Sequence, residues 1–445
     1  MFQSIKDRVK QFVGISFWDS IYKMFTFRDL FIAAFPTCLL RKVANVRKLQ
    51  ERKIEQLRKQ DKCRVVFFLQ TPSVWKYDAL YKKLVDSSYF EPLVVISPYN
   101  VHLNYDKQEC FRVMHQTEEF AHNHGYNYVS AYNWKKSRWR NIKKEYSPDI
   151  VFFTKPYKDT LPAYHIYNFS ECLTLYHPYG FNGSKLFHNN YGLPFQSLLW
   201  KFLLEADVFK KYAEQYEHSQ GDNVEVVGAL GMENLMLHDY KAVEVWKPQA
   251  KKKKRIIWAP HHTIDYLFNC SNFLNYCEDM LRLAEKYKDD IQIAFKPHPV
   301  LKVKLINIWG FEKTDAYYKR WANLDNGQIE QGDYIDLFKT SDAMIHDSVS
   351  FTAEYLYTGK PVLFQIKEKQ VIEEFNSFCK MCIEKHYHAY SIEETEKFIC
   401  EVVIEGKDPK KEQRERFYKQ YLYPKDGAMP SEKIFNILKN ALGKS

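Results

Sequence analysis

The feature that most constrains the fold is a repeated alternation of short apolar runs with amphipathic, helix-like stretches. Four apolar runs of strand length lie in the first half: CRVVFFLQ (63–70), EPLVVISPYN (91–100), PDIVFFTKPY (148–157) and CLTLYHPYGF (172–181). Continuous runs of β-branched and aromatic residues are typical of strands buried on both faces of a parallel sheet. Residues 73–85 and 108–125 have helical spacing and are predicted to cover that sheet.

The alternation restarts after NVEVVGALG (223–231), which we interpret as the crossing between two halves. The later strand candidates are KKKKRIIWAPHHTI (251–264), IQIAFKPHP (291–299), DAMIHDSVS (342–350) and GKPVLFQI (359–366). The sequence therefore predicts an α/β fold with two doubly wound domains in series. The predicted segments are 1–61 for N-terminal amphipathic and basic helices, 62–225 and 226–405 for the two domains, and 406–445 for C-terminal helices that return to the first domain.

The positive charge is concentrated near the N-terminus. The chain of 445 residues has a net charge of +10, and the stretch from Arg41 to Arg64 holds ten Lys or Arg against three acidic residues. The apolar run Leu30–Leu40 has 11 residues and contains Pro36, so it is too short to span a bilayer, which takes about 20 residues. Residues 1–60 are a candidate anchor on an anionic membrane surface, and the alternative is a helix pair packed on its own protein. No reader motif for nucleic acid accompanies the basic stretch, so nucleic-acid binding is not expected.

The cysteine pattern favours a reducing compartment. Nine cysteines are scattered along the chain, and their number is odd. Cys379 and Cys382 form a single CxxC with no second pair, so a structural role is favoured over a zinc or redox site.

Histidines follow three of the predicted strands in the second half. His261 and His262 follow one strand, His298 the next, and His346 ends a third. Because the carboxyl ends of parallel strands meet at one edge of a sheet, these imidazoles are expected to open onto one site. Pro297 and Pro299 flank His298 and restrict its backbone. With Lys296 beside it, an imidazole fixed in this way suits a phosphate.

The stretch SDAMIHDSVSFTAEYLYTGKPVLF (341–364) places Asp347, Ser348 and Ser350 at a strand-to-helix turn. Such residues cap helices, and the same turn can bind an anion such as a diphosphate. Glu354 lies one residue too far from Ser350 for a capping box, which leaves ribose hydroxyls or solvent as its partners. No GxGxxG, Walker A or acidic metal pattern is present, so neither a metal nor a cofactor is expected.

These motifs resemble those of a known family. IIWAPHHTI, FKPHP, YIDLFKTSDAMIHDSVSFTAEYLYTGKPVLF, PSVWKYDALY and LYHPYGF are similar to segments of the CDP-glycerol glycerophosphotransferases, the TagF-like enzymes of teichoic acid and capsule synthesis. The resemblance covers roughly residues 63–366. It implies a GT-B fold of two Rossmann-like domains with a central cleft, in which the N-terminal domain holds the acceptor and the C-terminal domain the nucleotide donor.

The resemblance also implies roles for individual residues. His177 of YHPYG resembles the catalytic histidine of the N-terminal domain, and His298 resembles the family's HP histidine. Asp347, Ser348 and Ser350 resemble the segment that contacts the donor pyrophosphate. We group Lys296, His261, His262 and Glu354 with this nucleotide and pyrophosphate site.

The resulting hypothesis is transfer of glycerol phosphate, or a related polyol phosphate, from a CDP-activated donor to a hydroxyl of a cell-surface glycan or lipid-linked acceptor. His177 is expected to act as general base. The enzyme is expected in the cytoplasm, peripheral on the inner face of the membrane. The alternatives are a glycosyltransferase that uses a CMP- or UDP-sugar and a non-catalytic capsule assembly factor.

Overall fold

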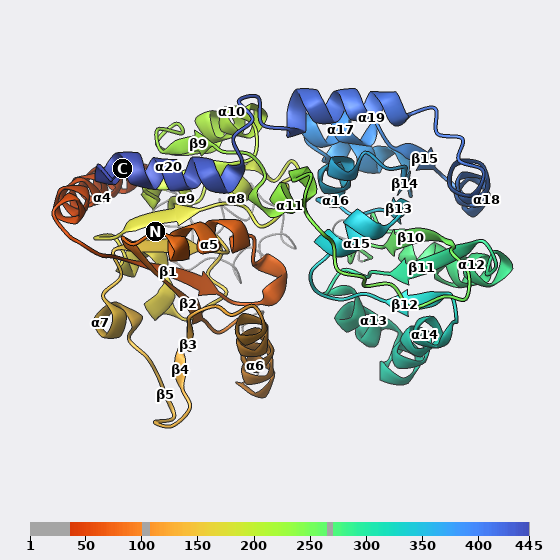
Figure 1. The fold of residues 1–445 in the computed structure, drawn as a ribbon, viewed down its shortest axis with the longest axis horizontal. Helices are drawn as coiled ribbons and strands as arrows, with labels where there is room; N and C mark the ends of the chain where they lie inside the picture. Colours follow the sequence, from red (N-terminus) through yellow and green to blue (C-terminus); the bar gives the residue numbers. More distant parts are fainter. Residues whose placement is uncertain (1–35, 100–106, 265–269, 445) are drawn as a thin grey trace, which may run out of the picture. The chain divides into compact units, whose positions relative to one another are not determined.

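The computed structural model describes residues 36–99, 107–264 and 270–444, which form two compact units (Figure 1). Unit 1 comprises residues 36–179, 186–231 and 426–444 of the described chain, and unit 2 comprises residues 180–185 and 232–425. The chain passes from unit 1 to unit 2 twice before residue 233, and it returns to unit 1 near its C-terminus.

Unit 1 is built on a parallel sheet with the strand order β3-β2-β1-β6-β7-β8-β9 among the described residues. The strands are β1 (Cys63–Leu69), β2 (Phe90–Ile96), β3 (Tyr128–Ser130), β6 (Ile150–Phe153), β7 (Leu173–Tyr176), β8 (Lys201–Leu204) and β9 (Val224–Val226). In β1 every residue except Arg64 is buried, which is why its sequence is an almost unbroken apolar run. The order reverses between β1 and β6, so the crevice at their carboxyl ends is the topological switch point.

Helices on both sides cover this sheet. They are α5 (Asp78–Asp86), α6 (Lys107–Asn123), α7 (Ile142–Tyr146), α8 (Phe187–Tyr191), α9 (Pro194–Leu198), α10 (Asp207–Tyr216) and α20 (Pro430–Leu442). A short antiparallel hairpin, β4 (Tyr132–Asn133) and β5 (Arg138–Trp139), extends from the β3 edge. Helix α20 packs against α4 and α5, and it buries Ile434, Leu438 and Leu442 in the core of unit 1.

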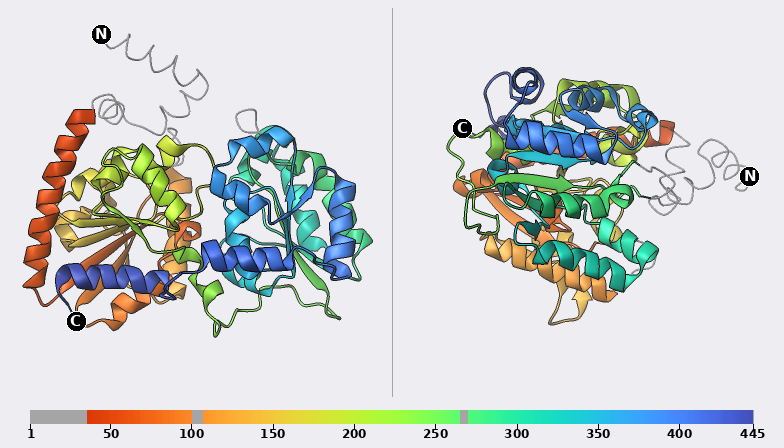
Figure 2. Two further views of the ribbon diagram at one scale, coloured as in Figure 1. Left: turned by 90° about the horizontal axis from the view of Figure 1, so that it is seen from above. Right: turned by 90° about the vertical axis from the view of Figure 1, so that its right-hand side faces the viewer.

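The basic helix α4 (Pro36–Arg58) packs on unit 1 (Figure 2). Its apolar side is buried at Leu39, Val43, Val46 and Leu57. The helix therefore follows the alternative in which this region packs on its own protein. The apolar run Leu30–Leu40 lies mostly outside the described residues.

Unit 2 repeats the architecture with the strand order β12-β11-β10-β13-β14-β15 in its described part, again all parallel. The strands are β10 (Lys254–Ala259), β11 (Ile291–Phe295), β12 (Gly327–Ile329), β13 (Ala343–His346), β14 (Val362–Gln365) and β15 (Tyr387–Ala389). The covering helices include α11 (Glu233–Met236), α12 (Phe273–Lys286), α13 (Leu301–Trp309), α14 (Phe311–Asn323), α15 (Ile335–Thr340), α16 (Phe351–Glu354), α17 (Ser377–Ile383) and α18 (Ile392–Lys397). The switch point here lies between β10 and β13.

The C-terminal segment differs from the expectation for residues 406–445. Helix α19 (Lys411–Phe417) belongs to unit 2, where the buried Arg414 donates to the Gly359 carbonyl and pairs with Asp408. Only the part from Asp426 onward lies on unit 1. The reason is the buried guanidinium, which requires polar partners that unit 2 supplies.

None of the helices in the described part of the chain combines the length and apolar character that a membrane crossing requires.

Candidate functional site

The candidate site lies at the carboxyl ends of β10, β11 and β13, beside the switch point of the second sheet. His261 and His262 follow β10, His298 follows β11, and His346 is the last residue of β13. The His298 backbone N–H donates to the Pro260 carbonyl at 3.1 Å, which ties the two histidine-bearing loops together. The sheet topology therefore brings the predicted strand ends to one place.

Three imidazoles form a tight cluster. The ring centroids of His262 and His298 are 4.2 Å apart, those of His261 and His262 are 4.3 Å apart, and those of His261 and His298 are 4.9 Å apart. At these separations, positive charges on all three rings would repel one another strongly.

Burial and neighbouring charges keep His261 and His298 neutral. Burial, followed by His262, Lys304 and Lys296, lowers the pKa of His298 to about 3. Burial and the other two imidazoles of the cluster hold the pKa of His261 well below its ordinary value. At neutral pH these two rings therefore offer hydrogen bonds rather than full charges, and a bound anion would favour their protonation.

The hydrogen bonds of His298 indicate its tautomer. The Val300 N–H donates to His298 Nδ1 at 3.2 Å, so in the neutral ring the proton is on Nε2. His261 Nδ1 is hydrogen-bonded to Thr263 Oγ1 at 3.0 Å, which orients the second ring. His298 therefore presents an N–H donor, the group that a phosphate oxygen accepts.

A metal ion is the other ligand that three imidazoles could take, because one nitrogen from each lies within 4.8 Å of the others. A ligating His298 Nε2 would need its proton on Nδ1, where it would meet the Val300 N–H. Lys296 and Lys304 also make the surroundings positive. Both features favour an anion over a cation at this cluster.

Asp347 is held by hydrogen bonds within the protein. Its carboxylate is fully buried and accepts from the His261 N–H at 2.6 Å, the Asn272 N–H at 2.6 Å and the Ser271 hydroxyl at 2.9 Å. Burial raises its pKa to about 6, although these hydrogen bonds act in the opposite direction. A buried carboxylate with three donors holds loops in place, and the pyrophosphate contact stays a prediction for this residue. Asp347 acts as a positioning residue for His261.

Ser348 donates its backbone N–H to the protein rather than presenting it to a ligand. The acceptor is His346 Nδ1 at 3.2 Å. His346 Nε2 lies 3.4 Å from His386 Nδ1, and His386 Nε2 lies 3.0 Å from the Thr352 carbonyl. With both protons on Nε2, these contacts form one continuous relay of donors and acceptors. His346 is thus part of a buried scaffold under the turn and not of the three-imidazole cluster.

Ser350 occupies the N-cap position of α16, but its side chain makes no capping hydrogen bond. Helix α16 has one turn and continues as a 3-10 turn from Tyr355 to Thr358. A helix this short has a small dipole, so the predicted contribution of the helix start to anion binding is reduced.

Lys296 and Glu354 meet at Tyr334. Lys296 Nζ donates to the Gly332 carbonyl at 3.0 Å and lies 5.4 Å from the centroid of the Tyr334 ring. The Tyr334 hydroxyl donates to Glu354 Oε2 at 2.7 Å, and Glu354 is buried. A Cβ on Gly180 would come within 3.2 Å of Glu354 Oε1. Glu354 is therefore neither solvated nor directed at a ribose in this structure, and Lys296 supplies positive potential beside His298.

The segment 180–185 packs on the turn that follows β13. A Cβ on Gly183 would lie 2.8 Å from both Val349 Cγ1 and Cys379 Sγ, so only glycine permits this approach. Cys379 and Cys382 are buried in α17, and burial raises both thiol pKa values. In this structure both cysteines of the CxxC are packed in the interior of unit 2.

His177 lies in unit 1, directly after β7, and is buried. Its Nδ1 is 2.8 Å from the Pro178 carbonyl, and its Nε2 is 2.9 Å from the Gly228 carbonyl. A neutral imidazole has one N–H and can satisfy only one of these oxygens, whereas the imidazolium would satisfy both. Burial nevertheless outweighs these hydrogen bonds and lowers the pKa of His177. His177 is therefore a neutral ring engaged with backbone on both sides.

The sequence analysis did not identify Ser271 and Asn272, which donate to Asp347, or His386, which contacts His346. Ser271 and Asn272 directly precede the amphipathic run of α12, which is the position of helix-capping residues. That signal could have identified them. His386 carried no local signal, because its role depends on a contact between separate strands.

Residues 237–440 match the family model described as CDP-Glycerol:Poly(glycerophosphate) glycerophosphotransferase. The solved structure of a variant of the wall teichoic acid polymerase TagF is similar with a TM-score of 0.56 and 11% identity, over 92% of this chain and 98% of that chain. A UDP-N-acetylglucosamine 2-epimerase is similar with a TM-score of 0.54 and 13% identity, over 86% of this chain and 97% of that chain. A putative enzyme of the same name from Listeria monocytogenes has a TM-score of 0.51 and 13% identity, over 86% and 96% of the two chains. No curated protein matches by sequence.

At these identities the structural similarities show the fold alone. The family match covers the second half of the chain and indicates its chemistry. The two parallel sheets with their covering helices agree with both. The chain has the GT-B fold, and its residues 237–440 match the model of the CDP-glycerol:poly(glycerophosphate) glycerophosphotransferase family.

Proposed function

We propose that this protein transfers glycerol phosphate, or a related polyol phosphate, from a CDP-activated donor to a hydroxyl of a cell-surface glycan or lipid-linked acceptor. The match of residues 237–440 to the glycerophosphotransferase family carries the proposal. The imidazole cluster lies within the matched region and has the hydrogen-bonding character that a diphosphate requires.

In the proposed reaction the acceptor oxygen forms a bond to the phosphorus that carries the glycerol. The bond from that phosphorus to the bridging oxygen breaks, and CMP leaves with this oxygen and its electron pair. The acceptor proton passes to a base. Phosphoryl transfer of this kind depends mainly on positioning and on stabilising charge at the transferred and leaving groups.

The donor diphosphate is assigned to His261, His262 and His298. The His298 Nε2–H would donate to a phosphate oxygen, and the approach of the anion would raise the lowered pKa of the ring toward protonation. Lys296 adds positive potential from its site beside Tyr334. Ser348 and Ser350 are proposed to line the turn next to the diphosphate through their side chains.

His177 is retained as the proposed general base. Its ring is neutral because of burial, as a base requires, and two backbone carbonyls are placed to stabilise the imidazolium that forms. The acceptor would have to reach Nε2 and displace the hydrogen bond that the Leu230 N–H donates to it at 3.4 Å.

Association with the inner face of the membrane is a further part of the proposal. The apolar side of α4 is buried, so membrane contact by this region would use the exposed basic residues Arg41, Lys48 and Arg52 of α4 and Lys59 directly after it. Flotation with vesicles that contain anionic lipid tests this. We expect binding that weakens at high salt and is lost when these four residues are replaced by glutamine; binding that survives the replacement would refute the role of α4.

The central experiment offers CDP-glycerol, CMP-sugar and UDP-sugar donors with a glycan acceptor, and measures nucleotide release and product mass. We expect CMP release from CDP-glycerol and a product that gains phosphorus. A product that gains a sugar without phosphorus would identify a glycosyltransferase instead. Tight CMP binding without turnover on any acceptor would indicate an assembly factor.

A further inference from the structure

The chain makes a short excursion from unit 1 into unit 2 at residues 180–185. It leaves unit 1 after Tyr179 and re-enters it at Leu186, and the crossing that continues into unit 2 follows only after Gly231. The connection of two domains does not require such an excursion. Because ordering the backbone costs about 1–2 kcal/mol per residue, specific contacts must hold this segment on unit 2.

Asn376 supplies the main attachment. Its side-chain Nδ2 donates to the Asn182 carbonyl at 2.5 Å, and its backbone N–H donates to the Gly183 carbonyl at 2.8 Å. Asn376 is 1% exposed, and its Oδ1 accepts from the Cys379 N–H as the N-cap of α17. One buried side chain therefore joins the excursion to the start of a helix of unit 2.

Backbone pairing and an aromatic contact add to this attachment. The Lys185 N–H donates to the Glu374 carbonyl at 3.0 Å. Phe181 is buried, and its ring stacks on that of Phe378 with the centroids 6.1 Å apart. Residues 180–185 therefore form a strap that is bound to unit 2 along its length.

The strap lies against the turn that follows β13. A Cβ on Gly180 would come within 3.2 Å of Glu354 Oε1 and 3.5 Å of Ser350 Cβ, and a Cβ on Gly183 would lie 2.8 Å from Val349 Cγ1. Ser350 is one of the residues proposed to line the donor diphosphate. The two glycines thus let the strap backbone sit directly on the donor turn.

The other end of the strap leads to His177. Only Pro178 and Tyr179 separate His177 from Gly180, so the Cα atoms of His177 and Gly180 can be at most about 11 Å apart. The fixed φ of Pro178 stiffens this connection. The His177 backbone N–H donates to the Tyr77 hydroxyl at 2.9 Å, which holds His177 in unit 1.

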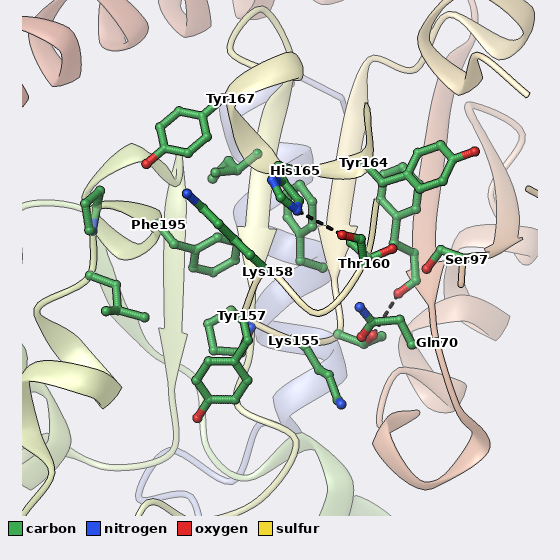
Figure 3. Close-up of a pocket in the computed structure, with 17 residues that line it drawn as sticks. Gln70, Ser97, Lys155, Tyr157, Lys158, Thr160, Tyr164, His165, Tyr167 and Phe195 are labelled. Atoms are coloured by element: carbon green, nitrogen blue, oxygen red, sulfur yellow. Dashed lines mark hydrogen bonds between the residues drawn. The ribbon is translucent and has the colours of Figure 1, made fainter. Parts of the chain in front are cut away.

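Tyr179 is also anchored in unit 1. Its ring packs against the core of this unit, and its hydroxyl is hydrogen-bonded to that of Tyr157. Tyr157 lines, with Gln70 and Lys158, a pocket at the carboxyl ends of β1 and β6 (Figure 3). The chain is therefore held on both sides of the step from Tyr179 to Gly180, which leaves no slack at this crossing.

From these contacts we infer that the strap positions His177 with respect to the donor turn, and that Asn376 and Gly183 are positioning residues for the transfer. A base must lie within hydrogen-bond reach of the proton it takes, and a displacement of about 1 Å can lower a rate 10²-fold. The inference rests on the proposed function. It deepens that function by naming the residues that set the distance from the base to the donor.

The decisive test inserts two glycines between Tyr179 and Gly180, which adds up to about 7 Å of slack. CMP release is measured with CDP-glycerol as donor and tri(glycerol phosphate), three glycerols joined by phosphodiesters, as acceptor. We expect kcat to fall by about 10–10²-fold while the KM for CDP-glycerol stays within about twofold. The control is the same insertion between Lys425 and Asp426, where the chain also crosses between the two units, and it should leave kcat within about twofold.

Asn376→Asp tests the attachment itself. Aspartate still caps α17, but its second carboxylate oxygen would face the Asn182 carbonyl without a proton to donate. We expect kcat to fall about fivefold or more at an unchanged KM for CDP-glycerol. Asn141→Asp, the same substitution at the N-cap of α7 in unit 1, should leave both constants unchanged.

Equal kcat values for the two insertion variants would overturn the inference. A raised KM for CDP-glycerol with unchanged kcat in Asn376→Asp would also overturn it, because the strap would then support the donor turn alone. Absence of CMP release from the unchanged protein is a different outcome, since it would refute the proposed function on which the inference rests.

Discussion

The two sheets of this protein share a topology and differ in the chemistry of their carboxyl ends. In both, the strand order reverses next to the first strand of the unit, β1 or β10, and a polar site lies at that reversal. In unit 2 the site is made of three clustered imidazoles, and a buried carboxylate anchors the backbone of one of them. In unit 1 it is made of lysines, tyrosines and a buried glutamine.

In both units the fold places polar side chains at the carboxyl ends of the strands beside the reversal, while the loops determine which side chains lie there. Imidazole N–H groups with lowered pKa values can change protonation as charge develops on a leaving diphosphate. The two sites are therefore expected to respond differently to the same kinds of perturbation.

The strongest response is expected from His298→Ala in unit 2. Loss of a donor to the leaving diphosphate should lower kcat/KM for CDP-glycerol by about 10²–10³-fold, measured as CMP release. His388→Ala, an exposed histidine of the same unit, serves as the control. If His298→Ala raised only the KM for the acceptor, His298 would not belong to the donor site, and the assignment of the donor to unit 2 would be contradicted.

His177→Asn in unit 1 is expected to lower kcat by about 10²-fold or more, because asparagine can keep a backbone hydrogen bond but cannot take a proton. The donor KM should change little. An unchanged kcat in the asparagine variant would show that His177 does not act as base and instead positions the backbone at Pro178 and Gly228.

Asp347→Asn tests the positioning clamp. The new amide nitrogen is a donor, so it could no longer accept the hydrogen bonds that the Ser271 hydroxyl and the Asn272 N–H donate to Oδ2. We expect a loss of about 2–3 kcal/mol in the free energy of unfolding and a fall in Tm of about 5–10 °C. The donor KM should rise because His261 loses its anchor. An unchanged Tm together with a raised donor KM would instead indicate direct contact with the ligand.

Acidification should destabilise unit 2. The pKa values of His298 and His346 are lowered to about 3, so between pH 3 and 6.5 the unfolded chain binds more protons than the folded one. Their contribution is complete above pH 6.5 and declines as the pH falls, by at most about 1.4 kcal/mol per pH unit and group. Asp347, with its pKa raised to about 6, opposes this between pH 3.8 and 6, but it is one group against several.

Thermal unfolding between pH 7 and 5 measures this dependence. Tm should fall with pH, and the fall should be smaller in His298→Gln than in the unchanged protein. A Tm that rises on acidification would contradict the buried, neutral state of the imidazoles.

The weakest response is expected from metal removal. Dialysis against 1,10-phenanthroline should change the transfer rate by less than about twofold, because the His298 tautomer favours an anion over a metal ion. Loss of activity that zinc restores would reassign the cluster as a metal site.

The layout of the two sheets can be predicted from the sequence alone. Buried parallel strands must be apolar on both faces, so runs such as CRVVFFLQ and IQIAFKPHP identify them locally. The strand-end histidines and the prolines around His298 could also be predicted from the sequence, because a strand end and a proline restraint are defined by residues adjacent in the chain.

The roles of several of these side chains, in contrast, depend on contacts between distant parts of the chain. Asp347 is a clamp because Ser271 and Asn272 reach it from another loop, and the Ser348 N–H is taken by His346. The pocket around Gln70 and Lys158 joins segments separated by about ninety positions in the chain. Contacts of this kind leave no periodic signal, because hydrogen bonding and burial are set by distances in space rather than by spacing in sequence.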